Sequence, residues 1–260
     1  MTIDQAVIPV LVIVFAVVIR LMERILIYCF GARLVLATGW LGTPVHEISH
    51  AICHFVFGHK IVSIKRFSPD LSTGTLGCVN YTYSPTNAFH QVGRFVSGVA
   101  PLFGGIAVIY ALEVWLLPGH INTDIGSAIA SLMSRYSYFS VDFLLSIAKS
   151  TSQLLVTLVS NLSVEVALYM LLGGAVALHM VPSGTDIKGS VLGALYLLTP
   201  LIVLSLVFPE RGRYVIAEIN HFLLEILIYL VPCLAVACLV TGVAVLFYLS
   251  HRLLLMRTRS

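Results

Sequence analysis

Long apolar stretches separated by short polar segments run along the whole chain. A helix rises about 1.5 Å per residue, so about 20 apolar residues cross the roughly 30 Å hydrocarbon core of a bilayer. The segments between the stretches contain Gly, Pro and charged residues, which end or interrupt helices. We therefore predict about six membrane-spanning helices, over residues Ala6–Phe30, Leu34–Phe57, Phe95–Leu117, Leu154–Leu178, Gly189–Phe208 and Phe222–Leu249.

Two connecting segments have patterns of their own. Gly58–Tyr83 is rich in β-branched and aromatic residues around a turn region at Pro69 and Gly74, which predicts a small β-hairpin directly after the second span. A later segment repeats apolar residues at helical spacing between polar ones, which predicts an amphipathic helix on the membrane surface. Its apolar residues are Ile125, Ile129, Leu132, Tyr136 and Phe139.

The composition excludes several classes of protein. Hydrophobic residues make up 58% of the 260 residues and charged residues only 10%, against about 25% charged in an average soluble domain. So few charges cannot cover the surface of a soluble globule, which excludes an ordinary cytosolic enzyme and a disordered chain. The net charge of +3 is too small to indicate a nucleic-acid partner.

We therefore expect an all-α polytopic membrane protein with a small membrane-associated β-hairpin after the second span. Residues 1–33 would form an N-terminal transmembrane helix, interpreted as retained because the sequence lacks the pattern of a signal peptide. Residues 34–189 would form a core, and residues 190–260 two further spans with a basic tail. The lipid bilayer is an expected partner, and the compactness of the chain favours a prokaryotic inner membrane.

The second span contains His46-Glu47-Ile48-Ser49-His50. Residues four apart on a helix project from one face, about one turn apart. Two neutral imidazoles and one further ligand can hold Zn²⁺ with an open position for water, and the adjacent glutamate can accept that water's proton. The composition predicts only about 0.01 chance occurrences of this pattern. Buried polar groups inside a span are expensive unless paired or metal-bound, which favours a metal site over a polar packing cluster.

Asp186 is the best candidate for a third ligand. It follows the fourth span closely, after Pro182 and Gly184, which break a helix and let the chain turn back. The ends of the second and fourth spans lie on the same side of the membrane because one span intervenes. His54 continues the histidine face and is a fourth ligand, an interfacial residue or a residue that supports the ligands by hydrogen bonding. The other acidic candidates are Glu113, Glu165 and Glu225.

These motifs resemble those of the site-2 protease family of intramembrane zinc metalloproteases, over roughly Gly42–Gly189. The His46-to-His50 motif is the strongest element, and the hairpin after it, with Lys60–Phe67 as a strand, resembles a membrane-associated hairpin of the family. Ser97-Gly-Val-Ala-Pro101 is similar to its small-residue stretch with a proline. His179-x-x-Pro182-x-x-x-Asp186 resembles its Asn-x-x-Pro…Asp-Gly motif, whose aspartate is the third zinc ligand.

The chain departs from the family pattern at several positions. His179 stands where the family has asparagine, and the spacing from Pro182 to Asp186 is one residue shorter. Ile187-Lys188-Gly189 replaces an immediate glycine, and Gly104-Gly105 stand where the family has an asparagine. An inserted periplasmic peptide-binding domain does not fit. The chain is thus similar to a divergent, minimal member, with residues 34–189 as its metalloprotease core.

The resemblance implies a zinc-dependent endopeptidase acting on membrane-embedded or membrane-proximal protein substrates. The implied Zn²⁺ ligands are His46, His50 and Asp186. Glu47 would be the general base, and His179 would donate a hydrogen bond to the developing oxyanion. Since a transmembrane substrate has to unwind locally, the hairpin would bind it as an extended strand, with Asn80 as a substrate contact or as a sheet-surface residue.

Three alternatives stay open. A non-catalytic relative would bind membrane proteins without cutting them, which the altered loop before Asp186 favours and the intact Glu47 opposes. A divalent-metal transporter would use the same ligands as a transit site, although no repeated halves are visible. A peptidase acting on a soluble or membrane-attached peptide is the third. The oligomeric state has no signature in the sequence.

Overall fold

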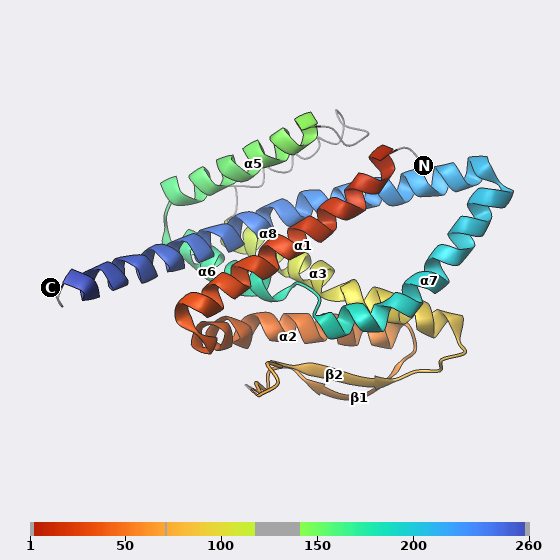
Figure 1. Cartoon of the computed structure of the whole chain (residues 1–260), viewed down its shortest axis with the longest axis horizontal. Coiled ribbons are helices and arrows are strands. Elements are labelled where there is room, and N and C mark those ends of the chain that lie inside the picture. Colours follow the sequence, from red (N-terminus) through yellow and green to blue (C-terminus); the bar gives the residue numbers. More distant parts are fainter. Residues whose placement is uncertain (1–2, 71, 118–140, 258–260) are drawn as a thin grey trace.

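The computed structural model describes residues 3–70, 72–117 and 141–257. This part of the chain is mostly helical, with one two-stranded sheet (Figure 1). The predicted amphipathic segment lies outside the described residues. The elements in chain order are α1 (Ile3–Phe30), α2 (Ala32–Val56), β1 (Lys60–Lys65), β2 (Cys78–Thr82), α3 (Ala88–Leu116), α5 (Val141–Ser160), α6 (Val164–His179), α7 (Gly184–Val207) and α8 (Pro209–Arg257).

Three helices in the described part of the chain are long and apolar enough to cross a membrane: α3, α7 and the section Tyr229–Leu254 of α8. This is compatible with the membrane protein that the composition predicted. In α7 only 11% of the apolar window is buried, so most of its apolar side chains are available to lipid. The helices α1 and α2 occupy nearly the same residues as the first two predicted spans. The count of about six spans stays a prediction.

The stretch Leu154–Leu178, predicted as one span, is two helices. Helix α5 ends at Ser160 and α6 begins at Val164. The Asn161 side chain donates to the Thr157 carbonyl at 2.9 Å, and the Ser163 hydroxyl caps α6 by accepting from the backbone N–H of Val166. Short polar side chains that bond to nearby backbone compete with helix continuation, so these residues interrupt an otherwise apolar run.

The C-terminal helix α8 is longer than the predicted sixth span. It begins at Pro209, where the missing N–H of a proline is harmless at the first position of a helix. It spans 49 residues in all and runs through the charged segment Glu210–Arg213 and past Pro232. At about 1.5 Å per residue its length, about 74 Å, exceeds the thickness of a bilayer.

The predicted hairpin is present. Strands β1 and β2 pair antiparallel, from Lys60 opposite Thr82 to Lys65 opposite Cys78, with one irregularity after Ile61. Strand β1 is two residues shorter than predicted. In the turn, the Asp70 carboxylate accepts hydrogen bonds from the Ser72 backbone and hydroxyl, which lower the pKa of this carboxyl. The hairpin lies along α2 (Figure 1).

The helices pack around α3 and α6. Helix α3 contacts α2, α6 and α7, and α6 also contacts α2 and α8. Their shared core includes Ile109 of α3, Tyr169 of α6 and Leu230 of α8, each at most 1% exposed. The connection between α1 and α2 reverses direction at Gly31, whose φ of +70° is accessible to glycine at little strain. Helix α2 lies between the hairpin and the core helices α3 and α6 (Figure 1).

Helix α2 approaches α6 closely at Gly42. A Cβ at this position would lie 2.4 Å from the Ala175 carbonyl oxygen and 2.8 Å from the His179 Cβ. Helix α6 could admit such a side chain only by moving away. The absence of a side chain at Gly42 therefore sets the distance between these helices.

We predict that Gly42→Ala lowers the free energy of unfolding by about 1 to 3 kcal/mol, since overpacking forces backbone shifts of this cost. Thermal unfolding of the detergent-purified protein measures the effect. The control is Gly242→Ala in α8, where nothing lies within 4 Å of an added Cβ. Equal melting temperatures for the two variants would show that the α2–α6 distance is not limiting.

Candidate metal centre

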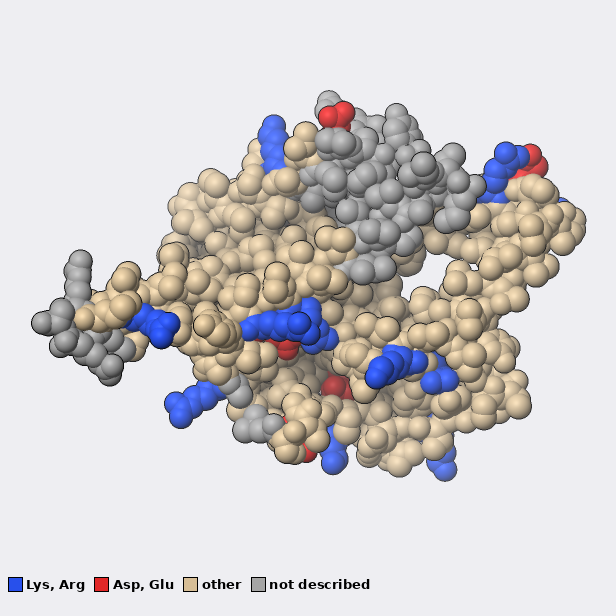
Figure 2. Space-filling model, in the orientation of Figure 1, with Lys and Arg blue, Asp and Glu red and all other residues tan. Residues whose placement is uncertain are grey.

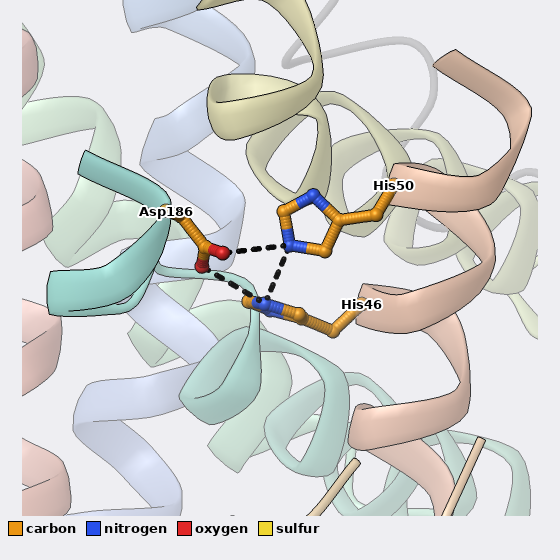
Figure 3. Close-up of side chains that lie close together, drawn as sticks. All are labelled: His46, His50 and Asp186. Atoms are coloured by element: carbon orange, nitrogen blue, oxygen red, sulfur yellow. Dashed lines mark hydrogen bonds and ion pairs between the residues drawn. The ribbon is translucent and has the colours of Figure 1, made fainter. Parts of the chain in front are cut away.

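Three potential ligands from distant parts of the chain meet in one cluster (Figure 3). His46 and His50 lie four residues apart on α2, and Asp186 lies in the first turn of α7. The two Nε2 atoms are 3.1 Å apart. The Asp186 carboxylate oxygens are 3.5 Å from the His46 Nε2 and 3.4 Å from the His50 Nε2. This group could hold a metal ion.

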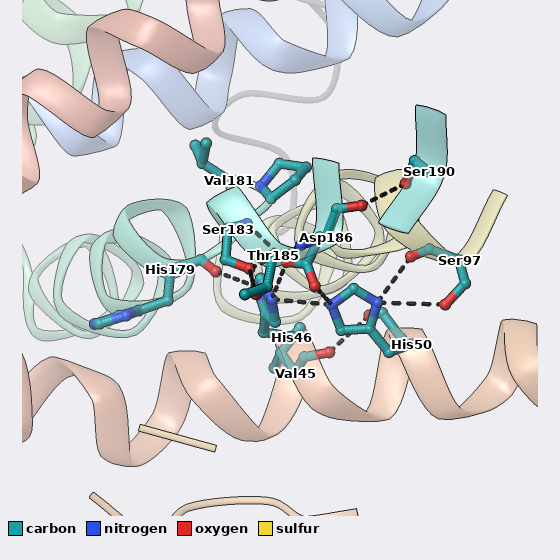
Figure 4. Close-up of polar contacts among 12 residues, drawn as sticks. Val45, His46, His50, Ser97, His179, Val181, Ser183, Thr185, Asp186 and Ser190 are labelled. Carbon is teal, nitrogen blue, oxygen red and sulfur yellow. Dashed lines mark hydrogen bonds and ion pairs between the residues drawn. The ribbon is translucent and has the colours of Figure 1, made fainter. Parts of the chain in front are cut away.

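Backbone carbonyls fix the orientation of both imidazoles. The Nδ1 of His46 is 2.8 Å from the His179 carbonyl oxygen, and the Nδ1 of His50 is 2.8 Å from that of Ser97 (Figure 4). A carbonyl only accepts, so each Nδ1 carries the hydrogen and donates it. Metal-binding histidines have the same arrangement, with one ring nitrogen donating to a carbonyl and the other facing the metal.

Both acceptor carbonyls are free for a structural reason. His179 is the last residue of α6, where helix carbonyls lack partners within the helix. Ser97 lies inside α3, and the residue four positions later is Pro101, which has no N–H to offer. The sequence Ser97-Gly-Val-Ala-Pro101 therefore creates an unpaired carbonyl in the middle of a helix, and His50 uses it.

The remaining ring nitrogens fit a cation. With hydrogen on both Nδ1 atoms, the neutral rings of His46 and His50 have lone pairs at the facing Nε2 atoms, beside the Asp186 carboxylate. Such a group repels itself unless a positive charge lies within it. Ligands at about 2.0–2.1 Å from a tetrahedral Zn²⁺ stand about 3.3 Å apart, close to the observed 3.1, 3.4 and 3.5 Å. Zn²⁺ is one ion that this donor set suits.

Asp186 is held by the start of α7. Ser183 caps the helix by accepting from the Asp186 N–H, and the Asp186 Oδ2 accepts from the Ser183 N–H at 2.7 Å. This reciprocal pair is a capping box. Asp186 therefore lies in the first turn of a helix and not in a loop that turns back. Arg20 of α1 supports the preceding segment by donating to the Pro182 carbonyl at 2.8 Å.

A cavity of about 770 Å³ opens at the cluster. Glu47, only 7% exposed, lines it together with the three possible ligands. The chain at Gly77 passes close by, since a Cβ there would lie 2.8 Å from the Glu47 Cγ. Figure 2 shows basic residues around a hollow in which acidic atoms are visible. The cations that line the cavity are Arg20, Arg94 and Lys188.

The side chains of two other predicted site residues, His179 and Asn80, make hydrogen bonds outside the cluster. The His179 ring points away from His46, and its Nε2 is 3.0 Å from the Thr38 hydroxyl (Figure 4). Its backbone carbonyl, rather than its ring, contacts the cluster. Asn80 lies on β2, where its amide donates to the Ser63 hydroxyl of β1. It is not among the residues that line the cavity.

Sequence reasoning missed the roles of Ser97 and Arg20. The signal for Ser97 was present, since a proline four residues after it in a helix frees its carbonyl. Arg20 had no such signal, because its partners, the Val181 and Pro182 carbonyls, are far away in the sequence.

Comparisons with known proteins found no matching family model, no matching curated protein and no matching solved structure. The family that the motifs resemble therefore stays an expectation. The chemistry of the cluster and of the cavity around it carries the functional argument.

We predict that the purified wild-type protein holds about one zinc ion per chain, and that His50→Ala and Asp186→Ala lose it. Removing one of three ligands leaves too few donors for a stable site. Metal analysis of the detergent-solubilised proteins measures the content, and elemental analysis also reports other metals.

The control variants are His221→Ala and Asp70→Ala, which remove the same residue types from exposed positions. Both should keep zinc. Retention of zinc by Asp186→Ala would show that another residue supplies the third ligand.

Proposed function

We propose that this protein is a zinc-dependent intramembrane endopeptidase that hydrolyses peptide bonds of membrane-embedded or membrane-proximal proteins. The observation that carries the proposal is the joining of two histidines, a carboxylate and the adjacent Glu47 around one cavity. Glutamate next to a three-ligand metal site is the arrangement of a metal-assisted hydrolase. Iron oxygenases also use two histidines and one carboxylate, but Glu47 favours hydrolysis.

Each residue has a defined task in this proposal. His46, His50 and Asp186 would hold the ion, which when bound supplies Lewis-acid polarisation and lowers the pKa of a water molecule. Glu47 accepts the proton of the attacking water and passes it to the leaving amine. Its burial beside the cavity keeps this carboxylate out of bulk water.

The proposal leaves His179 out of the chemistry, because its ring is engaged with Thr38. The His179 carbonyl instead orients His46. Among the chain's own residues, Arg94 of the cavity wall would then be a candidate to stabilise negative charge on the substrate carbonyl oxygen. Any residue has a backbone carbonyl that can orient His46, so this role is consistent with a histidine where the similar family has asparagine.

The hairpin forms one wall of the cavity. Residues 73–79, which lead into and along β2, line it together with residues of α2. An extended peptide entering there would lie between this segment and the cluster, as strand-like substrate binding requires. Asn80 is exposed on β2, and its bond to Ser63 uses one amide N–H, so its amide oxygen remains an acceptor for such a peptide. We infer that the substrate is a locally unwound segment of a protein in the bilayer, in a prokaryotic inner membrane.

We predict that Glu47→Gln abolishes proteolysis while about one zinc ion per chain remains, because the amide cannot accept the proton and the ligands are intact. The protein is reconstituted with prokaryotic membrane proteins in liposomes, and new peptide termini are identified by mass spectrometry. The control is Glu225→Gln, a matched change at a half-exposed position of α8.

Termini produced by wild type and by Glu225→Gln, but not by Glu47→Gln or after chelation, support the proposal. Equal cleavage by Glu47→Gln and wild type would show that Glu47 is not the general base. Zinc binding without any Glu47-dependent termini would favour a non-catalytic binding protein, and zinc uptake into the liposomes would favour a transporter.

A further inference from the structure

A chain of hydrogen bonds leads from the metal centre to the hairpin. The Ser97 hydroxyl is 3.0 Å from the His54 Nε2 and 3.4 Å from the His50 Nδ1. The His54 Nδ1 is 2.7 Å from the His59 Nδ1, and the His59 Nε2 is 2.9 Å from the His90 carbonyl oxygen. The chain thus connects α2, α3 and the start of the hairpin. The proposed hydrolysis uses neither His54 nor His59.

The acceptor at the hairpin end, the His90 carbonyl, determines where the hydrogens lie. The His90 carbonyl only accepts, so the His59 Nε2 carries a hydrogen. Burial lowers the pKa of His59 and favours its neutral form, which leaves its Nδ1 as an acceptor. The His54 Nδ1 then donates to it, and the bare His54 Nε2 accepts from the Ser97 hydroxyl. These three bonds are satisfied in one arrangement of hydrogens, and the Ser97 hydroxyl oxygen can still share the His50 Nδ1–H.

His54 and His59 are buried and are covered by an aromatic ring of the hairpin. His54 and His59 are 3% and 5% exposed. The Tyr81 ring of β2 stacks on both, with centroids 3.6 Å from His54 and 5.3 Å from His59. Apolar residues could fill this space at lower desolvation cost. A buried row of paired imidazoles is therefore better explained by its connection to His50 than by packing.

Pro101 contributes to the same arrangement. An N–H at this position would bond to the Ser97 carbonyl in a regular helix and compete with the His50 Nδ1. The proline removes the competitor, and the chain through His54 holds the Ser97 side chain beside it. Both features act on the ring nitrogen of His50 that does not face the cluster.

We propose that Pro101, Ser97 and His54 are positioning residues that act through His50: they fix its ring orientation and its tautomer for metal binding, and link the metal centre to the hairpin. The inference rests on metal binding by His46, His50 and Asp186, which the proposed function also requires. It does not rest on hydrolysis. Partners of this kind change metal affinity about 10- to 100-fold in metalloproteins.

Two substitutions at His54 separate hydrogen bonding from packing. His54→Phe keeps a ring for Tyr81 to stack on but offers no acceptor to Ser97. His54→Gln loses the ring but places an amide oxygen near the former Nε2. We predict about 10-fold weaker zinc binding for His54→Phe, near-normal binding for His54→Gln, and a shifted Co²⁺ absorption spectrum for His54→Phe alone. Full-length protein in detergent is titrated with each metal, and thermal unfolding confirms that the variants fold.

Substitution of Pro101 provides a second test, which leaves all the hydrogen-bonded side chains from His50 to His59 in place. Pro101→Ala restores an N–H opposite the Ser97 carbonyl and should weaken zinc binding while shifting the Co²⁺ spectrum in the same direction. The control is Pro200→Ala, a helix-interior proline at an exposed position of α7, which should change neither.

Wild-type zinc affinity and Co²⁺ spectrum in both His54→Phe and Pro101→Ala would overturn the inference. Weak binding by His54→Gln with normal binding by His54→Phe would also overturn it, since packing against Tyr81 would then be the role of the ring. Absence of metal binding by the wild type would overturn both the inference and the proposed function. Normal metal binding without Glu47-dependent cleavage would overturn the proposed function alone.

Discussion

Two imidazole lone pairs and a carboxylate face one another beside the cavity, and the surrounding helices are arranged to keep them there. The rings cannot turn away, because each Nδ1–H is bonded to a carbonyl of a neighbouring helix. The carboxylate cannot turn away, because the capping box binds it to the first turn of α7. A bound cation would offset the electrostatic repulsion within this group, which could hold a metal ion. Helices α2, α3, α6 and α7 each contribute a residue of the group or a bond that holds it.

Close packing brings the supporting groups within reach. Helix α2 meets α6 at Gly42, and α3 meets the start of α7 at Gly98, where an added Cβ would collide with Ser190. The Ser190 hydroxyl in turn donates to the Asp186 carbonyl. In a membrane, where apolar side chains gain little from avoiding lipid, small residues let helices approach and pack. Gly42 and Gly98 thus help to position the candidate ligands, and they also allow the helices to pack closely.

The differences between expectation and structure have local causes. The fourth predicted span is divided at Asn161 and Ser163, whose side chains bond to the backbone and satisfy two helix ends within an apolar run. Helix α8 continues through a charged segment because Pro209 begins a helix as readily as it ends one. Hydropathy measures the length of an apolar run, and it does not register such backbone bonding.

The sequence alone predicted features that depend on neighbours along the chain. The spacing of His46 and His50 places both rings on one helix face, the β-branched pattern predicts the hairpin, and the scarcity of charge indicates a membrane protein. Pro101 also indicates locally that the Ser97 carbonyl lacks a helix partner. Only the position of His50 beside it shows what this carbonyl binds.

Only the tertiary structure decided which distant groups meet. Topology favoured Asp186 as the third ligand, but its place in a capping box, the turn of the His179 ring toward Thr38 and the bonds from Ser97 through His54 to His59 depend on helix packing. Hydrogen bonds between segments far apart in the chain are set by the distances and rotations of packed helices. No pattern within a single segment contains that information.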